Sequence, residues 1–487
     1  MSLNLISDVW IPVLDSAGER RLIAPWQMAA PDLLRPDWPR PDLNVACLEL
    51  LIGLVRLVDP PAHSDDWEDR QAADPDRLRD RLAPFAPAFE LLGEGPRFMQ
   101  ELGGLAGEVR PPDALFIDSG GEGGALTVRE GRYPALDLPL AAMALYTMQT
   151  QAPSGGRGNL TSLRGGGPMS VLVEPRGGLW PLIWANVPDR VQDEKPATPE
   201  NLPWMRETLT SESGAQYFPH QGHPAEVFFG MPRRYRLVAE GDRVTGVIQR
   251  PSGTRYAGWR HPLTPYYRQK PGDEALPVRP RAGAFGYRHW LGVAVKAPGD
   301  LKEQPKTVTA WHDRSNGQAA RLIVAGWAME NMKARDYVFA RPPLVRLPKD
   351  REFLPVAMVA AADQVALSLR SALASVLAEG EAREAAREEF YLHTQVAFEA
   401  LLNRAAAADP ADLARIWLEQ LRAAALTIFD RLALPGLADR SLADQHAIVA
   451  ARRYLGATLA GYGPAGGKLF DALDLPRPDK RKKEAEA

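Results

Sequence analysis

The 487-residue sequence contains a single cysteine, Cys47, and this scarcity excludes several kinds of protein. A disulfide needs two cysteines, and multi-cysteine zinc or iron–sulfur sites need several. The chain must therefore be stabilised by its hydrophobic core, and a hydrophobic content of 45% supplies enough apolar material for one. Cys47 lies in an apolar helical run, so we expect it to pack in that core. The pattern fits a reducing compartment.

The sequence also lacks a large surplus of charge of either sign, because its net charge is only −3. A polycation that binds nucleic acid over its whole surface is excluded, and any such binding must use a local patch. No run is apolar over the ~20 residues that a membrane helix needs. Residues 1–13 lack the basic and apolar regions of a signal peptide. We therefore expect a cytoplasmic protein with no membrane partner.

The common catalytic signatures are missing as well. Gly467-Lys468 lacks the upstream glycine and the following hydroxyl residue of a phosphate-binding loop. Ser154 lacks the preceding glycine of a nucleophile elbow. His220 and His223 are the only close pair among eight histidines, and they leave one enzymatic alternative open, a metal-assisted hydrolase. We otherwise expect a binding protein with no catalytic residue and no cofactor.

Residues 1–350 predict a large mixed α+β domain. Apolar residues recur at helical spacing over 44–58 and 135–150. Regular βαβ alternation is missing, so a doubly wound sheet is not expected. Short apolar runs between turn residues predict strands at 3–13 (ended by Pro12), 170–173, 179–185, 235–238 and 244–248, and leave the type of 289–295 and 320–324 open.

Residues 351–475 predict a C-terminal four-helix bundle, because four helical runs of similar length are separated by short breaks. These runs extend from about Pro355 to Gly380, from 381 to 408, from Asp409 to Pro435 and from 441 to 459. Residues 476–487 mix both charges and lack large apolar side chains, which predicts a disordered tail. Such a bundle leaves open a second alternative, an adaptor that binds only proteins.

Residues 151–167 form a glycine-rich segment with two arginines, Arg157 and Arg164, and no acid. Glycine lets a backbone approach another surface closely, and arginine neutralises phosphate. The segment is either a loop laid against a nucleic-acid backbone or a pair of tight turns around a buried hairpin. Composition does not decide between the two.

Residues 231–270 carry a local surplus of positive charge, with nine basic residues against two acids. Tyrosines and a tryptophan are interleaved with them, which favours a face that neutralises phosphates and stacks bases. The alternative is strand alternation that places the aromatic residues inward and the arginines in solvent. The basic residues are Arg233, Arg234, Arg236, Arg243, Arg250, Arg255, Arg260, Arg268 and Lys270.

Residues 326–335 place methionine, asparagine, lysine and arginine in one short stretch after an apolar run. Methionine and asparagine can act as a wedge and a reader in the minor groove of DNA. Methionines at such spacing also serve as core filler.

Taken in order, five segments resemble the large subunit of the type I-E CRISPR Cascade surveillance complex, the CasA family. The resemblance covers most of the chain, and the helical last third agrees with the four-helix bundle of that family. Its segments are Asn4-Leu5-Ile6 with Trp10-Ile11-Pro12-Val13; Arg97-Phe98-Met99-Gln100; Gln151-Ala152-Pro153 through Leu163-Arg164-Gly165-Gly166-Gly167-Pro168; Trp259 with His261-Pro262 and Thr264-Pro265; and Met329-Glu330-Asn331-Met332-Lys333-Ala334-Arg335.

The resemblance implies a subunit that inspects double-stranded DNA for a protospacer-adjacent motif from the minor groove, while guide RNA reads the target sequence. It also implies contacts with the other Cascade subunits and recruitment of the helicase–nuclease. Three DNA-binding elements follow from it. They are the glycine loop Ser154, Gly155, Gly156, Arg157 and Gly158; the basic finger Arg250; and the wedge Glu330, Asn331 and Met332, followed by Lys333.

The sequence departs from the family pattern in three places. A cysteine cluster that some relatives hold before the Trp259 segment is absent. Arg157 stands in the glycine loop where others have glycine, and the finger is an arginine. The wedge lacks the Asn-Gln-Ala form.

Overall fold

The computed structural model describes residues 2–119, 126–129, 131–156 and 158–478. The chain divides into two compact units, one of Met1–Ala284 with Glu303–Leu344 and the other of Phe285–Lys302 with Val345–Ala487. The segment Phe285–Lys302 belongs to the second unit although residues 303–344 of the first unit separate it from the rest of that unit in the sequence. Its Tyr287 ring stacks on Phe398 at 4.3 Å between centroids, and its hydroxyl lies 2.9 Å from Thr394 Oγ1.

The first unit is built around two long buried helices, α1 (Pro41–Val58) and α4 (Leu138–Thr150), which pack on one another. Proline suits the first turn of α1, and the Asp137 carboxylate caps α4 by accepting from Leu140 N at 2.8 Å. Both helices agree with the sequence prediction. Shorter helices are α2 (Ser64–Asp69), α3 (Pro75–Leu82), α5 (Leu179–Ala185) and α6 (Lys306–Arg314).

The prediction of a strand at 179–185 is wrong, because these residues form α5. A seven-residue apolar run has no periodicity that separates a strand from a buried helix. Gly178 precedes the helix with a φ of 94°, and a Cβ there would lie 2.4 Å from Leu33 O. Only glycine can make this turn, and the turn starts the helix.

Two sheets of the first unit carry the segments that the sequence singled out. In one, β8 (Arg243–Arg250) pairs with β4 (Val109–Arg110), β5 (Leu136–Asp137) and β7 (Arg234–Glu240). In the other, β12 (Ala320–Glu330) pairs with β6 (Ser170–Pro175), β13 (Lys333–Ala340) and β14 (Pro343–Leu344). The strands predicted at 170–173, 235–238 and 244–248 are confirmed, and the open run at 320–324 is a strand that extends to Glu330.

The remaining strands form two small sheets. One has the order β2 (Arg20–Ile23), β1 (Ile11–Asp15), β3 (Leu33–Pro36), and the other joins β9 (Tyr266–Tyr267) to β10 (Leu276–Pro277) and β11 (Lys302–Glu303). The strand predicted over 3–13 begins only at Ile11, and Pro12 lies inside it opposite Leu22 instead of ending it.

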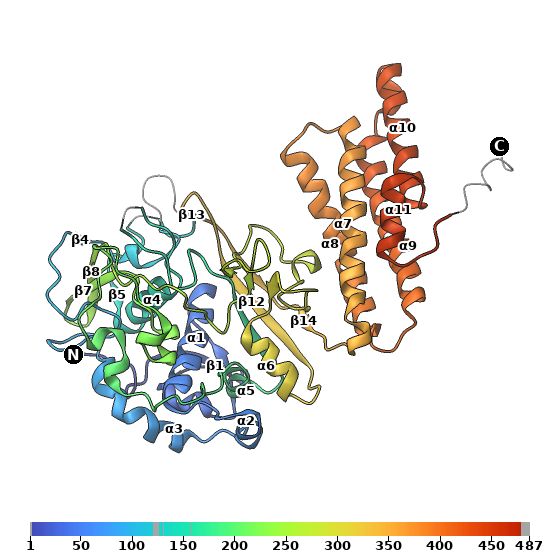
Figure 1. Ribbon diagram of the computed structural model, residues 1–487. Helices are drawn as coiled ribbons and strands as arrows, with labels where there is room; N and C mark the ends of the chain where they lie inside the picture. The colour runs from blue at the N-terminus through green and yellow to red at the C-terminus, as the bar shows by residue number, and fades with distance from the viewer. Residues whose placement is uncertain (1, 120–125, 130, 157, 479–487) are drawn as a thin grey trace. The chain divides into compact units, whose positions relative to one another are not determined.

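In the part of the second unit that the structure describes, five α-helices lie side by side (Figure 1): α7 (Phe353–Ala372), α8 (Glu381–Arg404), α9 (Pro410–Ala433), α10 (Leu442–Leu459) and α11 (Gly463–Ala472). The four predicted helices are present, and α7 contacts each of the other four. The prediction missed α11, because its glycines are typical of a loop. Gly466 is needed there, since a Cβ would lie 2.6 Å from the Gly461 carbonyl carbon.

The helical stretch Lys349–Ser375 is long and apolar enough to cross a membrane, which corrects the sequence-based statement that no such run exists. About half of its most apolar window, 56%, is buried inside the protein. Its inward side chains, among them Met358, Val365 and Leu369, are those of a core helix of the second unit.

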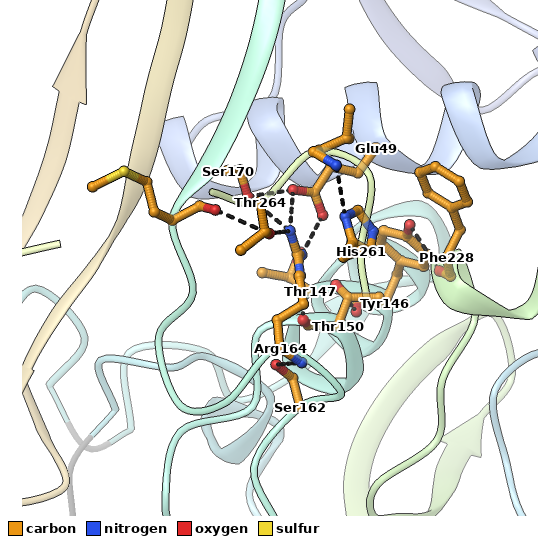
Figure 2. Close-up of polar contacts among 12 residues, drawn as sticks. Glu49, Tyr146, Thr147, Thr150, Ser162, Arg164, Ser170, Phe228, His261 and Thr264 are labelled. Carbon is orange, nitrogen blue, oxygen red and sulfur yellow. Dashed lines mark hydrogen bonds and ion pairs between the residues drawn. The ribbon is translucent and has the colours of Figure 1, made fainter. Parts of the chain in front are cut away.

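A buried ion pair anchors the glycine-rich segment to the core of the first unit (Figure 2). The guanidinium of Arg164 lies 2.7 Å and 3.1 Å from the two carboxylate oxygens of Glu49 on α1. It also donates to Ser170 Oγ, Thr264 Oγ1 and the Thr150 carbonyl. Both side chains are 1% exposed, so Arg164 does not neutralise phosphate. Composition left open whether the arginines of this segment meet phosphate or belong to turns around a buried structure, and Arg164 follows the second reading.

His261 lies beside this pair and is itself buried (Figure 2). Its Nδ1 accepts from Leu263 N at 3.2 Å. Burial lowers the pKa of His261 well below its ordinary 6.5, and the positive charge of Arg164 lowers it further. The imidazole is therefore neutral in the folded protein.

We predict that Arg164→Met destabilises the first unit by about 3–5 kcal/mol, because Glu49 keeps a buried charge without a counter-charge. Urea unfolding followed by tryptophan fluorescence measures the change. Adding Glu49→Leu should recover most of the loss, since a well-packed apolar pair can replace a buried ion pair. Arg250→Met, at an exposed position, is the control and should leave the midpoint unchanged. Equal midpoints for Arg164→Met and the wild type would contradict the anchoring role.

We also predict that stability falls as the pH is lowered through 6.5, the ordinary pKa of histidine. Below that pH the unfolded chain protonates His261 while the folded chain does not, so the unfolded state binds more protons and is favoured. His261→Gln should flatten this part of a profile of unfolding free energy against pH. All other groups contribute to both profiles, so their difference isolates His261; parallel profiles would show that it titrates normally.

Candidate nucleic-acid interface

The residues assigned to the wedge form the tip of the hairpin of β12 and β13. Glu330 pairs with Lys333, and Asn331 and Met332 make the two-residue turn between them with φ of 49° and 66°. Two successive positive values of φ are the geometry of the tight turns that fit the twist of a hairpin. Asparagine tolerates this region, but methionine adopts it at a cost on the order of 1 kcal/mol. The Met332 side chain is 57% exposed, so it projects from the tip instead of filling a core.

An ion pair flanks the tip. Arg335 Nε lies 3.0 Å from Glu330 Oε2, with both side chains largely in solvent. Glu330 alone would repel a phosphate backbone, and Arg335 cancels that charge. The sequence pattern alone gives Arg335 no role in the site, because its position five residues after Glu330 places the two side chains together only once the turn is known.

The glycine loop is a tight turn with an exposed outer edge. Asn159 closes it, because its N donates to Gly156 O at 3.1 Å and its Nδ2 donates to Gly155 O at 2.9 Å. Gly156 and Gly158 have φ of 85° and 77°, values that favour glycine. Ser154, Gly155 and Gly156 are exposed. Arg157, which the sequence assigned to this loop, lies outside the described residues.

Arg250 lies next to this loop, at the end of β8. Ser252 N donates to Gly158 O at 2.7 Å, and Gln249 Nε2 donates to Asn159 Oδ1 at 2.8 Å. The Arg250 side chain is exposed and has no ion pair or hydrogen bond within the part of the chain that the structure describes. Its charge is therefore available to a ligand at the outer edge of the loop.

The basic face predicted over 231–270 is not continuous. Arg234 pairs with Glu101, and Arg260 and Arg268 share Glu303. Arg236 and Arg243 donate to backbone carbonyls. The aromatic residues Tyr235, Trp259 and Tyr266 are buried, so they do not stack on bases.

Arg233, also counted in that face, is buried and holds the glycine loop from inside. Its Nε donates to Leu160 O at 3.1 Å, and its Nη2 donates to Pro153 O. These two hydrogen bonds hold the loop in place, so Arg233 is a structural residue. Composition alone does not distinguish it from an arginine that binds nucleic acid.

The geometry does not support a metal site at His220 and His223. Both ring nitrogens of His223 are used, because Nδ1 accepts from Ala225 N at 3.2 Å and Nε2 lies 3.1 Å from the Lys195 carbonyl. No lone pair remains for a metal. His220 stacks on Phe218 instead, and no group of three or more candidate ligands occurs among the described residues.

The structure brings one pair of the three predicted elements together, the glycine loop and the Arg250 end of β8, and it brings a later part of the same glycine-rich segment against the hairpin below the wedge. The glycine loop touches the Arg250 end of β8 through Gly158, where a Cβ would lie 2.7 Å from Pro251 Cβ. Further along the same segment, Gly167 lies against Met329, two residues before Asn331. The assignments of Gly155, Gly156, Gly158, Arg250 and residues 330–333 to a DNA contact stay predictions.

Comparison with known proteins gives this arrangement a context. A family model described as CRISPR-associated protein Cse1 matches residues 4–428. Thermus thermophilus CasA (Cse1) superposes with a TM-score of 0.76 at 20% identity, over 94% of this chain and 99% of that one. Cse1 from Acidimicrobium ferrooxidans superposes with a TM-score of 0.71 at 19% sequence identity, over 97% of this chain and 99% of that one. A chain of a CRISPR RNA-guided surveillance complex superposes with a TM-score of 0.69 at 15% sequence identity, over 93% of this chain and 99% of that one.

Proposed function

This chain belongs to the CRISPR-associated Cse1 family, the large subunits of type I-E Cascade, and we propose that it inspects double-stranded DNA for a protospacer-adjacent motif and starts strand separation. It acts without catalysis, in the cytoplasm, beside the other Cascade subunits and their guide RNA. It also recruits the helicase–nuclease that degrades the target.

The exposed Met332 at the tip of the hairpin is the observation that carries this proposal. An apolar side chain on a two-residue turn is narrow enough to enter a minor groove, and such wedges unstack base pairs at a cost of a few kcal/mol. At the end of β12 away from the tip, residues 320–325 pair with β6 and β14, which ties the base of the hairpin into a larger sheet.

The glycine loop and Arg250 support the same function by a different interaction. The exposed backbone of Ser154–Gly156 has no side chain larger than a hydroxymethyl group, so it can lie along a groove. Arg250 adds a positive charge beside it, suited to the negative potential of a narrow minor groove. Readout from that groove separates base pairs poorly, which fits recognition of a short and tolerant motif.

We predict that Met332→Gly abolishes strand opening while subunit assembly survives. Glycine accepts the φ of 66° at this position, so the hairpin is retained and only the wedge side chain is lost. Fluorescence of 2-aminopurine at the first base pair beside the motif, measured in the assembled complex, should show opening reduced on the order of ten-fold or more. Met332→Leu keeps an apolar wedge and should open DNA normally. Normal opening by Met332→Gly would refute the wedge.

We predict that Arg250→Ala weakens binding of the assembled complex to duplex DNA and lowers the slope of log affinity against log salt by about one, as expected for the loss of one cationic contact. Arg243→Ala is the matched control, because Arg243 starts the same strand at its other end and donates to Ala135 O. A salt slope that changes equally in both variants, or in neither, would place the finger elsewhere. Binding without any salt dependence would favour the protein-only adaptor.

A further inference from the structure

The glycine-rich segment spans two sheets, and each of its ends rests on a different one. Its first turn lies on the sheet of β7 and β8 through Gly158 and Asn159, beside Arg250. Its last residues run directly into β6, which pairs with β12 over six positions, Ser170–Pro175 against Ala320–Ala325. The segment therefore connects the element assigned to motif binding with the hairpin that carries the wedge.

The contact between the segment and the hairpin leaves no room for adjustment. Gly167 has a φ of 62°, and a Cβ there would lie 2.6 Å from both Met329 Cγ and the Trp327 carbonyl oxygen. On the opposite side of the contact, a Cβ on Gly326 would lie 2.4 Å from the Pro168 carbonyl oxygen. The glycine-rich segment and the hairpin thus each have a glycine at the point where the other segment packs against it.

This contact lies where the hairpin changes its register. A β-bulge falls between Ala328 and Met329, so that Met329 pairs with Ala334, one pair before the last pair of the hairpin. Bulges re-aim side chains and often lie next to functional sites. Here Met329 meets Gly167, and a shift of Gly167 would press on the hairpin at the base of its tip. Closely packed contacts of this kind transmit displacement because they compress little.

We propose that the contact between Gly167 and Met329 couples engagement of the glycine loop by duplex DNA to the placement of the Met332 wedge. Met329 and Gly167 are positioning residues: they touch no DNA, and they act through the hairpin tip. The inference rests on the proposed function, since it assigns no activity of its own. It gives a role to the two contacts of the segment, with the Arg250 end of β8 at its first turn and with the hairpin that carries the wedge at its last residues.

Two measurements on the assembled complex test the coupling. The first is affinity for a motif-bearing duplex whose strands are cross-linked beside the motif, which reports binding without opening. The second is opening of the ordinary target, followed by 2-aminopurine. Met329→Ala should leave the affinity for the cross-linked duplex unchanged and reduce opening at least about five-fold, the lower range of typical coupling between sites. A target with the first base pairs already mismatched should restore full engagement.

Two further variants serve as controls. Met329→Leu refills the contact and should restore opening. Phe339→Ala removes a half-exposed side chain from the same hairpin, far from the tip and opposite Ala325, and should change neither measurement.

The outcomes separate the coupling from the function on which it rests. Wild-type opening by Met329→Ala, with Met332→Gly inactive, would overturn the coupling and leave the wedge standing. Loss of affinity for the cross-linked duplex together with opening would show a merely structural role and also overturn it. Normal opening by Met332→Gly would refute the proposed function itself.

Discussion

The ion pair of Arg164 and Glu49 is the constraint on which the candidate interface depends. Two charges removed from water are costly, and they are tolerated only where each finds its partner and further hydrogen bonds. Here the guanidinium reaches α1, α4 and β6 at once, because it binds Glu49, the Thr150 carbonyl and Ser170. A glycine-rich segment without such a fixed point would sample many conformations. With it, the turn at Ser154–Gly158 and the contact at Gly167 are held at definite places.

The candidate interface is shaped largely by backbone conformation. Glycines with positive φ shape the loop, and the turn of Asn331 and Met332 uses the same region of conformational space at the hairpin tip. Such turns are short and stiff, and each is mounted on the end of a sheet. Functional residues commonly lie on loops that a rigid scaffold positions. In this protein the scaffold consists of two sheets, and the glycine-rich segment joins them.

Much of the fold could be predicted from periodicity alone, notably α1, α4 and the four long helices of the second unit. The errors have physical causes. The seven apolar residues of α5 are too few to show a period, and the glycines of α11 imitate a loop. For the candidate interface, the order of motifs singled out the glycine loop and the residues that form the hairpin tip, and their contact with DNA stays a prediction. Local composition overestimated the basic face, because the acids that neutralise it are remote in the sequence: Glu101 lies 133 residues before Arg234. The partner of Arg164 is likewise 115 residues away.

The assignment of Phe285–Lys302 to the second unit has a consequence for any attempt to divide the protein. The chain passes from one unit to the other three times, after Ala284, after Lys302 and after Leu344. A fragment that begins after Leu344 would lack Tyr287, which stacks on Phe398 and edges against Trp417 in the helical core. Trp290, which packs its ring edge to face against Phe398, would be lost with it. The helical unit is thus built from two separate stretches of the chain. An insertion or deletion within residues 285–302 would therefore disturb the packing of helices that begin more than fifty residues later.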